Sequence, residues 1–461
     1  MSGGTATATS PDPSRNGSSP GLERDEGDQG TRLKRGITGK LLFLFILGDV
    51  LGAGIYALIG QVAGEVGGAI WIPLLAALIM ALLTAGSYAE LVTKYPRAGG
   101  SAVFAERAYR SPLIAFLVGF SMLAAGVVSA AGLAHAFAGE YLVTFIDVSP
   151  EAGATAFLIL VALLNLRGIK ESMRANVVMT CIELSGLLLI VVIVAIFVAD
   201  GGGDPGRALE FADGKAPLSA VFAGAILAFY SFVGFETSAN VAEEIEDPSR
   251  VYPKALFGAL LVAGAMYVIV GIAATVAAPV EQLAESTGPF LTVIDATGSS
   301  LPDWVFSLIA LVAVANGALL TMIMSSRLTY GMADQGLLPR VLTRVLPIRR
   351  TPWVAILATT ALALILTFTG DLATLAETVV LLLLVVFLST NVAVLVLRRE
   401  TVDHEHFRVW SALPVLGAAS CIVLFTQQSA EVWIRGLILI ALGAVLYGLT
   451  RLFTNRDPSR P

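Results

Sequence analysis

The sequence predicts an all-α polytopic membrane protein with twelve transmembrane helices, and three observations support this fold class. The chain of 461 residues is 56% hydrophobic and only 14% charged, whereas soluble domains carry roughly 45–50% and 25%. Long apolar segments recur along the chain, and its Lys and Arg residues concentrate in alternate loops. A soluble chain this apolar could not cover its own surface, which excludes a cytosolic enzyme, a disordered scaffold and a fibrous protein.

The apolar segments are long enough to cross a bilayer as helices, since about 20 residues span a hydrocarbon core of roughly 30 Å. They are unbroken runs rather than short alternating strands, which excludes a β-barrel. We expect helices at about 41–63, 69–92, 113–138, 152–167, 175–199, 217–242, 255–279, 304–330, 352–369, 373–397, 410–427 and 432–454.

The placement of positive charge predicts the orientation of these helices. With the N-terminus inside, 24 Lys and Arg residues fall on cytoplasmic segments, and only Arg207, Lys215 and Arg435 fall outside. Cytoplasmic loops of membrane proteins carry such an excess of Lys and Arg. We therefore expect a multi-pass protein of the cell membrane with both termini in the cytoplasm.

Two of the predicted spans carry glycine near their middle. The first contains Gly52-Ala53-Gly54-Ile55, and the sixth contains residues 229–236, with Gly234 among them. Small residues are common where membrane helices pack together, so close packing is one explanation. However, the two segments are five spans apart and cross the membrane in opposite directions, which is typical of an inverted repeat with discontinuous helices.

Breaks at these positions would expose backbone groups of opposite polarity. The outer half of the first span would begin near Ala53–Ile55, where free N–H groups and the helix dipole suit a carboxylate. The outer half of the sixth span would end near Tyr230–Phe232 with free carbonyl groups, which suit an ammonium group. Free backbone at this depth is tolerated only where it lines a cavity. The pattern therefore predicts a binding site for a zwitterion, that is, an amino acid.

Several motifs in the same order and spacing resemble the amino acid–polyamine–organocation superfamily of permeases, over about residues 36–455. Within this superfamily, the sequence most resembles the cationic amino-acid transporter-like branch. The motifs are residues 52–55 (GAGI), 95–100 (YPRAGG), 229–236 (FYSFVGFE) with 243–250 (EEIEDPSR), and SSR at 325–327 followed by ADQGLLP at 333–339.

This resemblance implies a LeuT-type 5+5 inverted repeat plus two peripheral helices. It places repeat one at about 41–199, repeat two at about 217–397 and the peripheral helices at about 410–454. Residues 1–35 would be a disordered cytoplasmic tail, which their polar composition also predicts, and residues 456–461 would be a short cytoplasmic tail.

The resemblance also implies which residues bind the substrate. In similar permeases the glycine motif of the first span binds the carboxylate, which here corresponds to Gly52, Ala53, Gly54 and Ile55. The sixth-span segment binds the amino group and part of the side chain, and an aromatic residue at the position of Tyr230 is a lid in some of them. The second set of implied residues is Tyr230, Ser231, Val233 and Phe235.

Ionisable residues inside the predicted spans are candidates for coupling and gating, because a charge at that depth is costly. Asp49 lies one turn before Gly52, Glu183 lies in the fifth span and Glu236 begins the inner half of the sixth. Many proton-coupled members of the superfamily carry a lysine where Glu183 stands, so that lysine's role cannot be transferred unchanged. Some carry a proton sensor at the position of Glu236, although a helix dipole alone would also favour a carboxylate there.

We expect Asp49 and Glu183 to form a coupling site with the hydroxyl groups of Ser325 and Ser326, at the junction of the first, fifth and eighth spans. Two carboxylates in a poorly solvated pocket could share one proton. Carboxylates and hydroxyls also suit a sodium ion, and a structural, hydrogen-bonded carboxyl is a third interpretation.

The function that these features favour is secondary active transport of amino acids by alternating access, proton-coupled or by exchange. A sodium-coupled symporter and a transporter-like amino acid sensor are the alternatives. The expected partners are an amino acid, a proton or sodium ion and the lipid bilayer, without nucleic acid. No enzyme motif, nucleotide-binding loop or channel filter is found, and no cofactor or metal site is expected. The substrate's side chain is left open.

Overall fold

The computed structural model describes residues 36–97, 99–167, 172–347, 349 and 351–454. The predicted tails, residues 1–35 and 456–461, lie outside these ranges. Within them the regular structure is helical, and the β pairing consists of two isolated bridges, Ile37 with Ile245 and Gly67 with Phe211. The prediction of an all-helical protein is confirmed at this level.

The helices follow the predicted spans closely. Those that correspond to the spans are α1 Gly39–Leu51, α2 Ala53–Val66, α3 Trp71–Lys94, α5 Pro112–Ala138, α7 Pro150–Arg167, α8 Ser172–Ala199, α9 Pro217–Tyr230, α10 Pro248–Ala277, α13 Asp303–Asp334, α14 Trp353–Thr367, α15 Leu372–Leu397, α16 Ala412–Gln427 and α17 Ala430–Thr454. The shorter helices are α4 Gly100–Tyr109, α6 Glu140–Val143, α11 Val280–Glu285, α12 Pro289–Thr297, and the 3₁₀ helices η1 Pro205–Leu209, η2 Phe235–Glu244 and η3 Arg340–Thr343.

Helix length separates clear membrane spans from shorter helices. Among the described residues, nine helical segments are long and apolar enough to cross a membrane, and the bent pair α1–α2 makes a tenth. Helices α14 and α16 are apolar but have only 15 and 16 residues, which is roughly 23 Å at 1.5 Å per residue. The protein is therefore a polytopic membrane protein.

One helix begins well before its predicted start. The seventh span was expected from residue 255, but α10 already begins at Pro248 and contains Pro253 inside it. Proline is favoured in the first helical turn because its missing N–H has no partner there. The polar residues 248–254 therefore belong to the helix, although they are too polar to be recognised as part of an apolar span.

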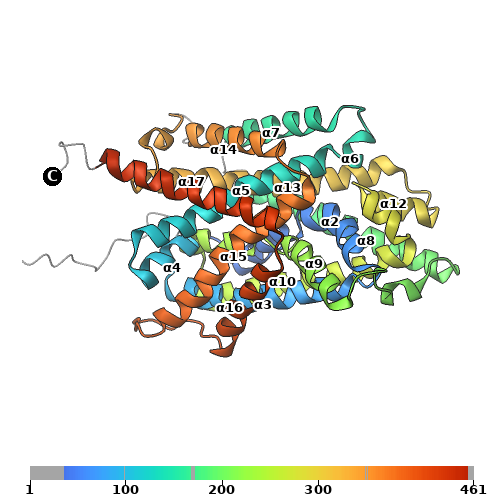
Figure 1. The fold of residues 1–461 in the computed structure, drawn as a ribbon, viewed down its shortest axis with the longest axis horizontal. Helices are drawn as coiled ribbons and strands as arrows, with labels where there is room; N and C mark the ends of the chain where they lie inside the picture. Colours follow the sequence, from blue (N-terminus) through green and yellow to red (C-terminus); the bar gives the residue numbers. More distant parts are fainter. Residues whose placement is uncertain (1–35, 98, 168–171, 348, 350, 455–461) are drawn as a thin grey trace, which may run out of the picture. The chain divides into compact units, whose positions relative to one another are not determined.

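The connections alternate between the two ends of the bundle (Figure 1). Helix α4 lies at the left-hand end in this view, and α6 and α12 lie at the right-hand end. Helix α5, which runs between these ends, packs against α13, α14 and α15. The two helices that carry the predicted breaks therefore sit in a bundle whose ends are built from short helices and loops.

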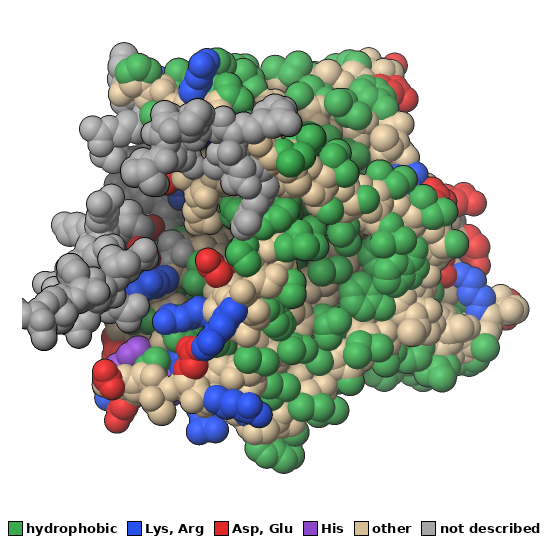
Figure 2. Space-filling model, turned by 60° about the vertical axis from the view of Figure 1, so that its left-hand side comes forward, with side chains coloured by type: hydrophobic (Ala, Val, Ile, Leu, Met, Phe, Trp, Pro, Cys, Tyr) green, Lys and Arg blue, Asp and Glu red, His purple; other side chains and the backbone are tan. Residues whose placement is uncertain are grey.

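The outer face of the bundle is apolar, as a bilayer requires. Figure 2 shows a broad surface of hydrophobic side chains, with Lys and Arg side chains gathered toward one end of it. Large apolar patches on a soluble monomer mark contact surfaces, and here they suit lipid. Residues with such exposed side chains include Val192 and Ile196 on α8, Leu261 and Ile269 on α10, and Ile438 on α17.

Candidate functional site

The first predicted break is present at Gly52. Helix α1 ends at Leu51, α2 begins at Ala53, and the two helices are bent by 41° relative to each other. The first N–H groups of a helix have no intrahelical partner. The backbone amides of Ala53, Gly54 and Ile55 are thus the groups that α2 offers at the break.

The second predicted break follows Tyr230. Helix α9 ends there, and the 3₁₀ helix η2 begins at Phe235. Between them, Gly234 has φ +124°, a conformation that favours glycine. A Cβ at Gly234 would also lie 2.7 Å from the carbonyl oxygen of Asp49. This turn therefore needs glycine for its backbone conformation and for its close approach to α1.

The two breaks meet each other directly. A Cβ at Gly54 would lie 2.7 Å from the Cα of Ser231, so the start of α2 rests on the end of α9. Ile55, Tyr230 and Ser231 are buried beside this contact, with exposed fractions of 1%, 5% and 3%. The structure thus brings together predicted residues from the first and sixth spans, 175 or more positions apart in the chain.

A tyrosine that the sequence analysis missed joins the two breaks. The Tyr267 hydroxyl on α10 lies within hydrogen-bonding reach of the carbonyl oxygen of Val50 on α1 and of Ser231, the latter at 3.0 Å. Because a hydroxyl has one proton, Tyr267 can donate to one of these two carbonyls at a time, and the Tyr230 carbonyl accepts from the N–H of Val233 at 3.1 Å. A carbonyl oxygen has two lone pairs, so each can still accept a second donor.

The other predicted binding residues differ in their surroundings. The hydroxyls of Tyr230 and Ser129, on α5, are 2.9 Å apart. The Phe235 side chain instead stacks on Phe387 and meets Tyr88 edge to face, with ring centroids 5.4 and 5.7 Å apart. Val233 is half-buried. Phe235 therefore belongs to an aromatic cluster with Phe387 and Tyr88.

Two of the predicted coupling carboxylates border the second break. Asp49 is half-buried and accepts a hydrogen bond from the Thr237 hydroxyl, which also reaches the Gly234 carbonyl at 2.8 Å. Glu236 is buried, and its carboxylate accepts from the N–H of Gly234 at 2.9 Å. Glu236 thus accepts a hydrogen bond from the backbone at the start of η2, which is a structural role that a helix start favours. Asp49, through Thr237, connects the same turn to α1.

Glu183 lies where α8 meets α13 and α1. Asn316 on α13 donates to its Oε1 at 2.9 Å and is also 2.9 Å from the Asn176 side-chain oxygen. Among the described residues, neither Glu183 Oε2 nor Asn176 Nδ2 has a hydrogen-bond partner, although both are buried. A Cβ at Gly48 would overlap the Thr180 hydroxyl, so α1 packs against α8 beside this network.

The predicted serines are not part of this network, and Asn316 stands in their place. Ser326 accepts from Asn165 on α7 at 3.3 Å, and the Ser325 hydroxyl lies against Gly126 on α5. Ser325 follows Asn316 by nine residues, or two and a half turns, so it faces the opposite side of α13. Helices α1, α8 and α13 meet beside Glu183, and the α13 residue that contacts it is Asn316.

A different buried carboxylate, Glu90 on α3, is fully paired. Arg398 donates to both of its oxygens, at 2.8 and 2.7 Å, and the N–H of Val409 donates to Oε2 at 3.0 Å. Nearby, Lys94 donates to the carbonyls of Leu397 and Glu400, at 2.6 Å each. These contacts, which we name the α3–α15 clamp, hold the ends of the two helices together.

Residues 38–442 match the family model described as "Amino acid permease". The chain belongs to the amino acid permease family. The permease is thus a member of the amino acid–polyamine–organocation superfamily, as the motifs predicted, and a protein of amino acid transport.

Curated relatives agree with the family assignment. The permease is 29% identical to the branched-chain amino acid permease BcaP of Bacillus subtilis, over 90% of this chain and 93% of that protein. It is 26% identical to the methylthioribose transporter of the same species, over 90% and 93%. It is 27% identical to the vacuolar cationic amino acid transporter 4 of Arabidopsis thaliana, over 76% of this chain and 61% of that protein. These relatives are transporters rather than enzymes.

Proposed function

We propose that the permease is a secondary active transporter that carries amino acids across the cell membrane by alternating access. The observation that carries this proposal is the contact between two interrupted helices at Gly54 and Ser231. Discontinuous helices at a repeat interface are where such transporters bind substrate and ion. The proposed architecture is twelve membrane spans, including the short α14 and α16, in a LeuT-type 5+5 inverted repeat with α16 and α17 peripheral.

The two helix ends would bind the two charges of the substrate. The amides of Ala53, Gly54 and Ile55 would donate to the carboxylate, aided by the dipole of α2. The carbonyl of Ser231 would accept from the ammonium group, with its second lone pair available beside Tyr267. Tyr230, whose hydroxyl is near that of Ser129, would close over the substrate as a lid.

The relatives' names and the walls of the site favour a neutral side chain. Ile55 and Val233 supply apolar surface next to Ser231, and one relative is named as a branched-chain amino acid permease. Other relatives are named for cationic amino acids and for methylthioribose. We therefore propose a broad range that includes branched aliphatic amino acids.

Coupling is proposed at Asp49 and Glu183, with Asn316 in the place that Ser325 and Ser326 were expected to take. Glu183 Oε2, left without a partner among the described residues, can carry a proton or ligate a cation. Its position where α1, α8 and α13 meet would link its occupancy to movement of the broken helix α1. Uptake measured at fixed membrane potential, with pH and sodium varied separately, distinguishes proton coupling from sodium coupling.

The proposed orientation places both termini in the cytoplasm, as the excess of Lys and Arg on alternate loops indicates. Labelling of single cysteines, introduced into the loop before α4 and the loop containing α12 in a variant without Cys181 and Cys421, would test it. The α4 loop should react only in permeabilised cells, and the α12 loop in intact cells.

Purified permease in sealed proteoliposomes tests the function itself. A transporter accumulates radiolabelled leucine in proportion to vesicle volume, and unlabelled branched-chain amino acids compete with it. Binding without volume-dependent accumulation would instead identify an amino acid sensor, and the absence of binding for every one of the twenty amino acids would overturn the proposal.

A further inference from the structure

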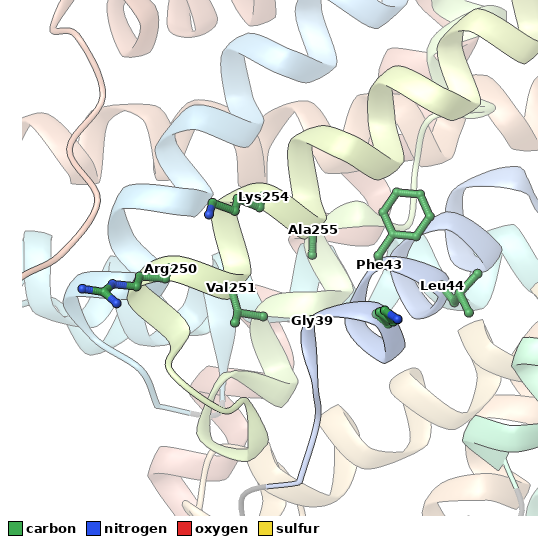
Figure 3. Close-up of a pocket in the computed structure, with 8 residues that line it drawn as sticks. Gly39, Phe43, Leu44, Arg250, Val251, Lys254 and Ala255 are labelled. Atoms are coloured by element: carbon green, nitrogen blue, oxygen red, sulfur yellow. The ribbon is translucent and has the colours of Figure 1, made fainter.

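A pocket of about 500 Å³ lies between the first turns of α1 and α10, far along the helices from the central breaks. Lys40 and Phe43 line it from α1, and Arg250, Val251 and Lys254 line it from α10 (Figure 3). In Figure 3 the side chains of Arg250 and Lys254 extend from the same flank of α10, away from Phe43 and Leu44 on α1. The walls of the pocket are almost entirely apolar, and the three cationic side chains extend from the helices that flank it.

Close packing of the two helices forms the apolar part of the pocket. A Cβ at Gly39 would lie 3.4 Å from Val251, and one at Gly258 would lie 3.4 Å from the ring of Phe43. Phe43 and Val251 are half-buried, so each still exposes part of its surface to the pocket. The pocket therefore offers a preformed apolar floor rather than a surface built from mobile side chains alone.

The three cations are available to a ligand. Lys40, Arg250 and Lys254 are all exposed. Arg250 has an ion pair with Asp247 at 3.9 Å, but both side chains are largely exposed, and such pairs contribute little. Among the described residues, no ion pair involves Lys40 or Lys254. Glu246 and Asp247 directly precede α10, and the N–H of Glu246 donates to the carbonyl of Ile37 just before α1, so carboxylates beside the pocket compensate part of this positive charge.

The pocket lies where the apolar outer face of α10 begins. Leu261, Val262 and Ile269 on this helix have exposed fractions of 51%, 40% and 48%, as residues in contact with acyl chains do. Leu261 follows Lys254 by seven residues, which is roughly 10 Å along the helix. A molecule with a phosphate at the cations could therefore lay hydrocarbon chains along α10, whereas a soluble anion would use only the charges.

We propose that this pocket binds the headgroup of an anionic phospholipid whose acyl chains lie along α10. Basic pockets between membrane helices suit such headgroups, and each nearby Lys or Arg adds to the attraction. Helix α1 carries the first break, and α10 supplies Tyr267 to both breaks. Because the lipid would contact both helices at their starts, its binding would stabilise their packing against each other. The proposal rests on membrane insertion and is independent of the transported substrate.

Native mass spectrometry of the full-length purified protein, titrated with phosphatidylglycerol or with phosphatidylcholine of the same chains, tests the proposal. Removing two charges in Arg250→Gln/Lys254→Gln should weaken phosphatidylglycerol binding roughly 10- to 30-fold and leave phosphatidylcholine binding unchanged. The matched control, Arg340→Gln/Arg344→Gln, removes two exposed cations at the same spacing from η3 and its end. It should bind phosphatidylglycerol like the wild type.

A charge-preserving variant, Arg250→Lys/Lys254→Arg, keeps the test independent of folding defects and should retain the lipid preference. Equal losses in the pocket variant and the control would show nonspecific attraction and overturn the proposal, as would equal binding of the two lipids by the wild type. In a further experiment, inorganic phosphate at roughly 10 mM competes with phosphatidylglycerol for the protein. If phosphate displaced the lipid as effectively as unlabelled phosphatidylglycerol does, the pocket would be assigned to a soluble anion.

Discussion

A glutamate is buried in the α3–α15 clamp and another near the central breaks, but the two carboxylates differ in how fully they are hydrogen-bonded. In the clamp, Glu90 accepts three hydrogen bonds, two of them from Arg398, so each oxygen has a partner. Near the breaks, Glu183 accepts one hydrogen bond from Asn316, and its Oε2 has no partner among the described residues. Both side chains are almost fully buried.

This difference separates a carboxylate that holds helices together from one that, in the proposed function, binds and releases a proton or cation. A buried polar group without a hydrogen-bond partner costs free energy, so the unpaired Oε2 of Glu183 lowers the stability of the folded protein. Unsatisfied groups of this kind call for an explanation beyond packing. We infer that the clamp contributes stability and that the region of the breaks contributes transport.

The largest effect on stability is expected at the clamp. Glu90→Gln leaves the mostly buried Arg398 without its carboxylate, and breaking a buried ion pair costs about 3 kcal/mol or more. Unfolding of the detergent-solubilised protein should shift to lower temperature or denaturant concentration accordingly. Protein that remains folded should still couple uptake to the ion gradient, and loss of coupling without loss of stability would contradict the assigned role.

The largest effect on transport is expected at the contact between the breaks. In Gly54→Ala the new methyl group would lie 2.7 Å from the Ser231 backbone, which cannot move aside as a flexible side chain would. Substrate binding should weaken about 100-fold, or about 2.7 kcal/mol, as measured by scintillation proximity. Gly132→Ala is the control, because its methyl group would meet only leucine side chains at 3.6 Å. Equal losses in both variants would refute the importance of the Gly54 contact.

Replacing Glu183 by glutamine should have the opposite effect to Glu90→Gln, with a loss of transport rather than of stability. Glu183→Gln keeps the hydrogen-bond acceptor that Asn316 uses but removes the site for a proton or cation. Stability should change by less than about 1 kcal/mol, while accumulation in proteoliposomes falls to the level of passive equilibration. Counterflow exchange, which needs no gradient, provides the control and should persist. Full gradient-driven accumulation by this variant would remove Glu183 from the coupling site.

A smaller effect is expected from Tyr267→Phe. Loss of the hydroxyl removes the one hydrogen bond that Tyr267 donates to the carbonyl of Val50 or Ser231, which is worth about 1 kcal/mol. Substrate affinity should fall about fivefold, with little change in thermal stability because water can donate to the freed carbonyls. A Tyr252→Phe variant, whose hydroxyl meets Ser238 at 2.8 Å instead, should keep wild-type affinity. Tighter binding in Tyr267→Phe would mean that this hydroxyl competes with the substrate.

Local sequence signals were sufficient to predict the long apolar helices and both breaks. Gly52, Gly54 and Gly234 interrupt apolar runs, and a glycine acts on the backbone where it stands. The starts and ends of most spans follow directly from hydropathy. The start of α10 did not, because Pro248 and the polar residues after it belong to a helix that extends beyond the apolar core.

Tertiary partners could not be predicted in the same way. Tyr267, Thr237 and Asn316 lie in segments without a motif, and only the packing of α10, η2 and α13 brings them to the breaks. Ser325 and Ser326 were chosen because they belong to a recognisable motif, but the helical phase directs them toward α5 and α7. Counting turns from Asn316 to Ser325 would have shown that they face opposite sides.

The most direct test of the account is whether both charged ends of an amino acid are recognised. Isothermal titration of the purified permease should detect binding of leucine, whereas leucinamide, which lacks the carboxylate, and N-acetyl-leucine, which lacks the ammonium group, should each bind at least 100-fold more weakly, about 2.7 kcal/mol. Equal binding of leucine and either derivative would contradict the proposal that the amides at Gly54 and the carbonyl at Ser231 hold a zwitterion between two interrupted helices.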